Sequence, residues 1–123
     1  MKGQIKAIAF ITYPVTDMPR SRAFYEAFLG LQVTANWDDA WVEYDIGDST
    51  LAITNTFPHL KPGASGCVMA LEVADFDEVL ASLKSSGTEL FTGPFDTPAC
   101  RGCSIKDPDG NEVILHARKE ASD

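Results

Sequence analysis

The side chains most able to carry chemistry are two cysteines, a histidine and a glutamate. Cys100 and Cys103 form a Cys-x-x-Cys pair, which at a turn or helix start can act as a redox dithiol or as half of a zinc site. His116 follows them in the sequence, and a cysteine beside a histidine can form a thiolate nucleophile. Glu72 and His116 are also residue types that transfer protons in acid–base catalysis. The elements that carry these residues decide which of these chemistries is available.

The strand predicted from Cys100 to Lys106 argues against both a dithiol and zinc. Residues i and i+3 of a strand point to opposite faces, so Cys100 and Cys103 would not meet. The chain has three cysteines, which leaves no second pair to complete a zinc site and favours a reducing compartment over a disulfide framework. Cys100 stays a candidate nucleophile if it faces His116. The alternative is a small packed residue beside a histidine at a strand end.

The composition is typical of one compact cytoplasmic domain. The chain has 123 residues, of which 45% are hydrophobic, and its formal net charge is −8. An acidic chain is poorly suited to a phosphate backbone, so we expect no nucleic-acid partner; the charge suits a cationic ligand, or it simply keeps the protein soluble. No apolar run approaches the roughly 20 residues that cross a bilayer, so no membrane partner is expected. The N-terminus also lacks the features of a signal peptide.

Two segments of the sequence, starting at Ile8 and Cys67, have the same layout. Each begins with a short apolar strand that reaches Val-x-Asp, and Asp17 and Asp75 are placed to cap the helix that follows. Glycines at positions 30 and 87 then supply the left-handed residue that ends a helix. One face of each helix is marked by residues three and four positions apart: Ser21, Phe24, Tyr25 and Phe28 in the first, and Phe76, Val79, Leu80 and Leu83 in the second.

Three strand-like runs follow each predicted helix. They are Leu31 to Ala35, Trp41 to Asp45 and Ser49 to Asn55 in the first half, and Thr88 to Phe91, Cys100 to Lys106 and Glu112 to Arg118 in the second. A linker at about 56–66 is rich in Pro and Gly. The sequence therefore predicts a single α+β domain over residues 1–123, built from tandem βαβββ modules at about 5–55 and about 67–119.

The segment Asp107 to Asn111 predicts the register of the last two strands. Its sequence DPDGN fits a three-residue hairpin loop with Gly110 in the bulge position. Residues whose numbers sum to 218 then face each other, which places Ser104 opposite Ile114 on one face of the sheet. The same register pairs Gly102 with His116 and Cys100 with Arg118 on that face, and sends Cys103 and Leu115 to the other face.

This layout resembles the vicinal oxygen chelate superfamily, which includes glyoxalase I, bleomycin and fosfomycin resistance proteins and extradiol dioxygenases. The resemblance is carried by Val-x-Asp before a helix that contains Ala23-Phe24-Tyr25 and ends Phe28-Leu29-Gly30, and by the stretch DPDGNEVILH. It covers nearly the whole chain and is specific for a fold rather than for an activity. It implies that the two modules curve into a cup-shaped, largely antiparallel sheet with the helices outside.

The resemblance also implies where a metal would bind, on inward positions of the first and last strands of each module. Those positions map to Phe10 and Ala52 in the first module and to Val68 and Ile114 in the second. Divalent ions need oxygen or nitrogen donors, and these four side chains offer only carbon. We therefore predict no metal and no other cofactor, which excludes metal-dependent glyoxalase and dioxygenase chemistry.

The remaining cup is predicted to hold a ligand. Side chains alternate along a strand, so Thr12 shares the side of Phe10, while Ala70 and Glu72 share the side of Val68, with Glu72 near the rim. Aromatic side chains can stack on a planar or cationic ligand, and the alternative for Trp41 and Phe57 is packing at a dimer interface or core edge. We expect the alternative for Phe57, on the linker beside His59, and leave both open for the tryptophans. The predicted ligand-binding residues are Phe10, Thr12, Trp37, Trp41, Ala52, Val68, Ala70, Ser104, Ile114 and His116.

Three functions fit these expectations. The first is a metal-free small-molecule binding protein of this superfamily, with an organic, cationic or aromatic ligand. The second is a metal-independent isomerase or lyase for a small carbonyl compound or conjugate, using His116, Glu72 or Cys100. The third is a structural or regulatory dimer whose cup is filled by its own side chains. A homodimer is expected in each case because two modules leave sheet edges and apolar surface to cover. The sequence does not decide whether each cup is formed within one chain or shared between two chains.

Overall fold

The computed structural model describes residues 1–64 and 66–119. The chain divides into two compact units, and the boundary between Pro62 and Gly63 falls inside the predicted linker. Residue 65 of that linker and the last four residues of the predicted domain lie outside the described residues. None of the described helices combines the length and apolar character needed to cross a membrane.

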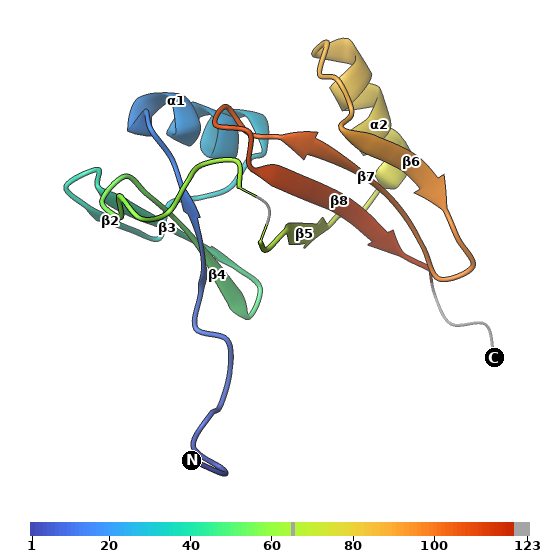
Figure 1. Ribbon diagram of the computed structural model, residues 1–123. Helices are drawn as coiled ribbons and strands as arrows, with labels where there is room; N and C mark the ends of the chain where they lie inside the picture. The colour runs from blue at the N-terminus through green and yellow to red at the C-terminus, as the bar shows by residue number, and fades with distance from the viewer. Residues whose placement is uncertain (65, 120–123) are drawn as a thin grey trace. The chain divides into compact units, whose positions relative to one another are not determined.

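The first unit contains one predicted βαβββ module (Figure 1). Its four-stranded sheet has the order β1-β4-β3-β2, with β1 parallel to β4 and the other two pairs antiparallel. The elements are β1 (Ile11–Pro14), α1 (Met18–Arg22), the π-helix η1 (Ala23–Phe28), β2 (Ala35–Trp37), β3 (Trp41–Ile46) and β4 (Ser49–Thr54).

The second unit repeats this topology. Its sheet has the order β5-β8-β7-β6, again with one parallel pair, β5 and β8, and two antiparallel pairs. The elements are β5 (Met69–Glu72), α2 (Phe76–Ser85), β6 (Thr92–Asp96), β7 (Cys100–Lys106) and β8 (Glu112–Arg118). Two mixed sheets, each with a helical segment, confirm the predicted α+β class and the two βαβββ modules.

The predicted helix boundaries are confirmed in both units. The Asp17 carboxylate accepts a hydrogen bond from the Arg20 backbone N–H at 3.0 Å, and Asp75 accepts one from Glu78 at 3.1 Å. Both contacts satisfy an amide that has no partner within the helix. The two glycines that follow the helices have φ of 78° and 71°, the left-handed region predicted for the residue that ends a helix.

The first helix departs from the predicted α-helical spacing after one turn. Residues 23–28 form a π-helix, in which the Leu29 N–H donates to the Phe24 carbonyl five positions earlier at 2.9 Å. The wider turn rotates later residues off the face that Ser21 and Tyr25 bury. Phe28 was predicted on that face and is instead exposed.

The strand after each helix lies further along the chain than predicted. We expected strands at Leu31–Ala35 and Thr88–Phe91, but β2 begins at Ala35 and β6 at Thr92. In the second unit the sequence Gly93-Pro94 reads as a loop, yet β6 is an edge strand, where a residue without an N–H is tolerated. A register shift between Thr92 and Phe95 absorbs the irregularity.

The predicted register of β7 and β8 is confirmed. Ser104 pairs with Ile114, Gly102 with His116 and Cys103 with Leu115. The Asp107 N–H donates to the Asn111 carbonyl at 2.8 Å, and Gly110 has φ of 85°. The Asp107 carboxylate also accepts from the backbone N–H groups of residues 109 and 111. The turn therefore fixes which side chains share a face.

Each sheet buries one face against its own helix. In the first unit the helix-side residues include Tyr13, Val42, Tyr44 and Ile53, and in the second Met69, Ile105, Val113 and Leu115; all are buried. The Tyr44 ring lies 6.1 Å from Tyr25 of η1, which fixes the side on which the helix lies. Alternation sends the neighbouring residues to the opposite side, called here the helix-free face of each sheet.

Candidate functional site

The helix-free face of the first unit carries a chain of four aromatic rings. Phe10 meets Trp41 edge to face at 5.3 Å between ring centroids. Trp41 meets Phe57 at 5.7 Å, and Phe57 meets His59 at the same separation. Trp41 alternates with the helix-side residue Val42, so it points away from the helix. We call these four residues the aromatic chain.

The aromatic chain keeps exposed surface and has a carboxylate beside it. Phe10 is 45% exposed, and Phe57 is also exposed. The indole N–H of Trp41 donates to Glu43 Oε2 at 2.8 Å, which fixes the orientation of the ring. Trp37 pairs with Trp41 across β2 and β3 and is 56% exposed. Exposed rings beside negative charge suit a planar or cationic ligand.

The turn between β2 and β3 holds the two tryptophans opposite each other. Asp38 and Asp39 both have positive φ, 54° and 53°, and the Ala40 N–H donates to the Trp37 carbonyl at 2.9 Å. A β-turn whose two central residues both lie in this region matches the twist of a hairpin, but those residues are normally Asn and Gly. The Asn36 side chain stabilises it by hydrogen bonds to the Asp39 carboxylate and backbone N–H.

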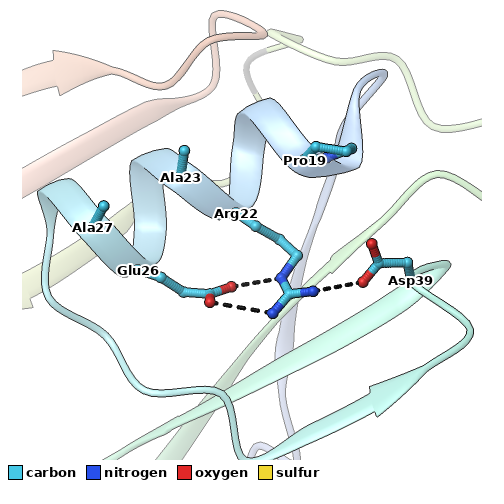
Figure 2. A pocket seen from close by; sticks show the side chains of 6 residues that line it. All are labelled: Pro19, Arg22, Ala23, Glu26, Ala27 and Asp39. Carbon is cyan, nitrogen blue, oxygen red and sulfur yellow. Dashed lines mark hydrogen bonds and ion pairs between the residues drawn. The ribbon is translucent and has the colours of Figure 1, made fainter.

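Arg22 joins this turn to the helix (Figure 2). Its guanidinium donates to both carboxylate oxygens of Glu26, at 2.7 and 3.2 Å, and to Asp39 Oδ1 at 2.7 Å. The buried Tyr44 hydroxyl also donates to Glu26 at 2.8 Å. Arg22 and then Tyr44 lower the pKa of Glu26 against the opposing effect of burial. Burial first, then Glu26, raises the pKa of Tyr44.

The residues of this ion-pair network line a surface hollow that lies apart from the predicted ligand-binding residues. It is lined by Pro19, Arg22, Ala23, Glu26, Ala27 and Asp39, as Figure 2 shows. None of these is a predicted ligand-binding residue. The Arg22 guanidinium is already engaged by two carboxylates, so the arrangement is that of a structural clamp rather than an anion site.

Two predicted ligand-binding residues lie side by side on the helix-free face of the first sheet. Thr12 and Ala52 pair across β1 and β4, and Glu43 continues the row on β3. Ala52 is fully buried. The Thr12 hydroxyl oxygen is also buried and has no hydrogen-bond partner among the residues that the structure describes. A buried hydroxyl of this kind is normally paired, so this one calls for an explanation.

The helix-free face of the second unit carries a polar pair in place of the aromatic chain. Glu72 Oε1 lies 2.6 Å from His116 Nδ1 across β5 and β8. The other oxygen of Glu72 accepts from the Arg118 backbone N–H, also at 2.6 Å. The Arg118 backbone and then His116 lower the pKa of Glu72, so this carboxyl is ionised at neutral pH. An ionised carboxylate only accepts, so Nδ1 of His116 is the donor.

Phe95 lies beside this pair. Cross-strand pairing places Phe95, Gly102, His116 and Glu72 in one row across the sheet. A Cβ on Gly102 would lie 2.4 Å from the Phe95 ring, so the ring covers the glycine. Phe95 is 39% exposed. Along this row the imidazole therefore lies between the Glu72 carboxylate and Gly102, which the Phe95 ring covers.

The adjacent row contains the other predicted residues of this face. Ala70, Ile114, Ser104 and Thr92 pair across the sheet, with the two hydroxyls 2.6 Å apart. Ser104 is buried, Ile114 half-buried and Ala70 exposed. Val68, one position before β5, is also exposed. The face is thus mostly small or apolar around His116.

The two cysteines lie on opposite faces of β7, as the sequence predicted. Cys103 is buried on the helix side, where burial raises the pKa of its thiol. Cys100 is half-buried, and its sulfur lies 3.6 Å from Thr97 Oγ1. In the described part of the chain, the side-chain contacts of Cys100 and His116 go to Thr97 and Glu72 rather than to each other. This arrangement does not favour a Cys–His nucleophile.

The four positions at which the family resemblance implies a metal ion carry side chains that cannot bind one. Phe10, Ala52, Val68 and Ile114 offer carbon alone. Across residues 1–64 and 66–119, no group of three or more His, Cys, Asp or Glu side chains is placed to hold a metal ion. Glu72 and His116 bond to each other and supply two donors at most. The donor chemistry therefore gives no basis for a metal-dependent step.

Three features of these faces were not predicted from the sequence. Phe95 follows Gly93-Pro94, which reads as a loop, so neither its strand nor its place over Gly102 was expected. Phe57 was assigned to a dimer interface or core edge, and its contact with Trp41 was not foreseen. The Glu72–His116 contact had a usable signal, because a parallel pairing of the first and last strands of a module brings both side chains to one face.

Known proteins similar to this chain match most of its length. The model of a family described as the glyoxalase/bleomycin resistance protein/dioxygenase superfamily matches residues 7–115. TnmS3, an antibiotic binding protein from Streptomyces sp. CB03234, is 26% identical with a TM-score of 0.80, covering 94% of this chain and 98% of that one. A glyoxalase/bleomycin resistance protein from the same organism is 28% identical with a TM-score of 0.73, covering 89% and 98%.

A more distant likeness supports the fold alone. A glyoxalase/dioxygenase from Nostoc punctiforme is 20% identical with a TM-score of 0.79, covering 98% of this chain and 96% of that one. No functionally curated protein matches this sequence.

Proposed function

The chain belongs to the glyoxalase/bleomycin resistance protein/dioxygenase superfamily, and from this premise we propose that it is a metal-free protein that binds a planar organic molecule. The observation that carries the proposal is the aromatic chain on the helix-free face of the first sheet. Three ring contacts connect its four residues, and Phe10 and Phe57 keep exposed surface for a ligand. The likeness to an antibiotic binding protein is consistent with this function.

The charge around the aromatic chain favours a cationic ligand. Glu43 bonds the Trp41 indole, and the whole chain carries a net charge of −8. A cation over an indole ring is attracted by the electrons of its face, and a nearby carboxylate adds to that attraction. The Thr12 hydroxyl, buried in the same sheet, is a further group that a ligand could satisfy after a local rearrangement.

Calorimetric titration with three anthracene-sized probes tests this proposal. The probes are proflavine as the cation, 9-anthracenemethanol as the neutral molecule and anthracene-9-carboxylate as the anion. We expect the cation to bind tightest and the anion weakest, and Trp41→Ala to weaken proflavine binding about tenfold or more. Phe28→Ala is the matched control, because Phe28 is an exposed ring of η1 outside the aromatic chain. Equal binding by wild type and Trp41→Ala contradicts the proposal.

The metal-free state is part of this proposal and has a separate test. Elemental analysis of protein purified from its own source cells, without chelator, should find no divalent metal near one equivalent per chain. Proflavine binding should also be unchanged by EDTA. A stoichiometric metal would show that donors other than the four carbon-only positions form a site.

A second candidate function is a metal-independent isomerase or lyase acting on a small carbonyl compound. The Glu72–His116 contact favours it, because a carboxylate that holds Nδ1–H leaves Nε2 able to accept a proton. Incubation with hydroxyacetone in D₂O, followed by proton NMR, would detect exchange at the carbon beside the carbonyl. Exchange that His116→Ala abolishes and Cys100→Ser leaves intact would support this function and assign the base.

The assembly and location of the protein are proposed alongside. We propose a single domain of two modules that forms a homodimer in the cytoplasm and binds neither nucleic acid nor membrane. Native mass spectrometry of protein from its source cells measures the subunit number and any retained ligand together. A dimer that retains no ligand and binds no probe would favour the third function, a structural or regulatory dimer.

A further inference from the structure

The Glu72–His116 pair fixes the hydrogen-bonding character of one ring nitrogen. Both oxygens of Glu72 are engaged, one by His116 Nδ1 and the other by the Arg118 backbone N–H, each at 2.6 Å. This double contact holds the carboxylate in place from β8. Because the carboxylate accepts from Nδ1–H, the neutral imidazole carries its lone pair on Nε2. In this tautomer, Nε2 of His116 is a hydrogen-bond acceptor rather than a donor.

The surroundings of His116 are suited to a flat molecule. Phe95 covers Gly102 in the same row, and its ring is partly exposed. Ala70 and Ile114, in the adjacent row, add small and apolar surface. The imidazole itself keeps about a quarter of its side-chain surface exposed. An aromatic ligand here would find ring and apolar contacts around a single polar acceptor.

We propose that His116, held by Glu72, selects aromatic ligands that carry a hydroxyl group by accepting its hydrogen bond at Nε2. This inference rests on the proposed small-molecule binding function and adds a chemical class, a phenol-like donor, to it. A site built around such an acceptor rejects an analogue without the donor, because the bound analogue displaces water from the nitrogen without supplying a partner. Glu72 acts as a positioning residue, and His116 contacts the ligand.

A matched pair of probes tests the inference. We expect 2-naphthol to bind the wild-type protein about fivefold to tenfold more tightly than 2-methoxynaphthalene, which has the same rings without the donor. His116→Phe should bring this ratio to about one. Glu72→Gln should reduce it, since an amide can also donate to Nδ1 and move the proton to Nε2. Glu89→Gln, an exposed carboxyl outside the pair, should leave the ratio unchanged.

The tautomer of His116 provides an independent readout. Long-range proton–nitrogen correlation NMR of ¹⁵N-histidine protein at neutral pH should show the proton on Nδ1 in wild type, and a changed distribution in Glu72→Gln. A proton on Nε2 in wild type overturns the inference. Equal binding of the two naphthalenes also overturns it while the binding function stands. If neither naphthalene binds and proflavine also fails, both proposals fall.

Discussion

The two units fold the same way, yet their helix-free faces carry different chemistry. The first presents the aromatic chain around Trp41, with its indole held by Glu43. The second presents one imidazole, held by Glu72, beside a single phenylalanine. The strand order and the parallel pairing of first and last strands are identical. The repeated topology supplies two equivalent platforms, and the residues on them decide what each can recognise.

The units also differ in how an arginine joins helix to sheet. Arg22 lies on the helix and is held by two carboxylates, Glu26 and Asp39. Arg101 lies on β7 and reaches back to Asp77 of α2 at 3.0 Å, with its guanidinium 4.8 Å from the centre of the Phe76 ring. Asp77 is mostly exposed, so solvent weakens this second tie. The ion pair that joins helix to sheet is therefore weaker in the second unit than in the first.

The largest expected difference concerns two glycines with positive φ. A Cβ on Gly93 would lie 2.9 Å from the Gly102 carbonyl oxygen and 3.0 Å from Cys103 Cα, both backbone atoms. Gly93→Ala should therefore destabilise the protein by about 2–4 kcal/mol, from backbone strain and overpacking together. Gly47→Ala is the control, because Gly47 has φ of 58° but open space around its Cα, and should cost about 1 kcal/mol. Urea unfolding measures both, and equal losses would contradict the packing argument.

The second prediction compares the two arginines. Arg22→Met should cost about 2 kcal/mol, because it leaves the part-buried Glu26 with Tyr44 as its remaining side-chain partner. Arg101→Met should cost less, since its carboxylate partner is mostly solvated and methionine can still pack on Phe76. Urea unfolding at low and high salt would measure the loss in the free energy of unfolding for each variant. A larger loss of stability for Arg101→Met than for Arg22→Met would contradict this ranking of the two ion pairs.

A third prediction compares Thr12 of the first sheet with Ala70, which occupies the equivalent position in the second sheet. Thr12→Val keeps the shape of the side chain and removes a buried hydroxyl that has no partner among the described residues. We expect a gain of about 1 kcal/mol in the free energy of unfolding. Ala70→Val, which adds volume to an exposed position, is the comparison and should change stability little. A loss on Thr12→Val would show that the hydroxyl is satisfied in solution.

The smallest expected effect is on the acid side of the stability curve. The folded protein holds the pKa of Glu26 below its ordinary value of 4.5, chiefly through Arg22. The unfolded chain therefore binds the proton first, so this stabilisation is present above about pH 4.5 and is lost as pH falls through the lowered value. Glu26→Gln should flatten the decline in urea midpoint between about pH 5 and about pH 3. An unchanged slope would assign acid sensitivity to other carboxyls.

Much of the frame was predictable from local signals. Asp17 and Asp75 mark helix starts because a short carboxylate can reach an unpaired amide, and the structure confirms both caps. The DPDGN turn gave the register of β7 and β8, since a hairpin loop of fixed length leaves one pairing. The strand at Phe95 was not predictable in this way. Its Gly-Pro sequence is typical of a loop, and pairing with β7 at a sheet edge decided otherwise.

The sequence by itself determined the two modules, the resemblance to the family and the carbon-only residues at the positions where that resemblance implies a metal. These follow from residue type and spacing along the chain, which are local. Tertiary structure alone decided that Phe57 reaches Trp41 and that Glu72 bonds His116. The parallel pairing of β5 with β8 indicates that Glu72 and His116 share a face. The hydrogen bond itself, and the path of the chain after β4 that brings Phe57 to Trp41, do not follow from residue patterns along the chain. The chemistry proposed for each face depends on those contacts.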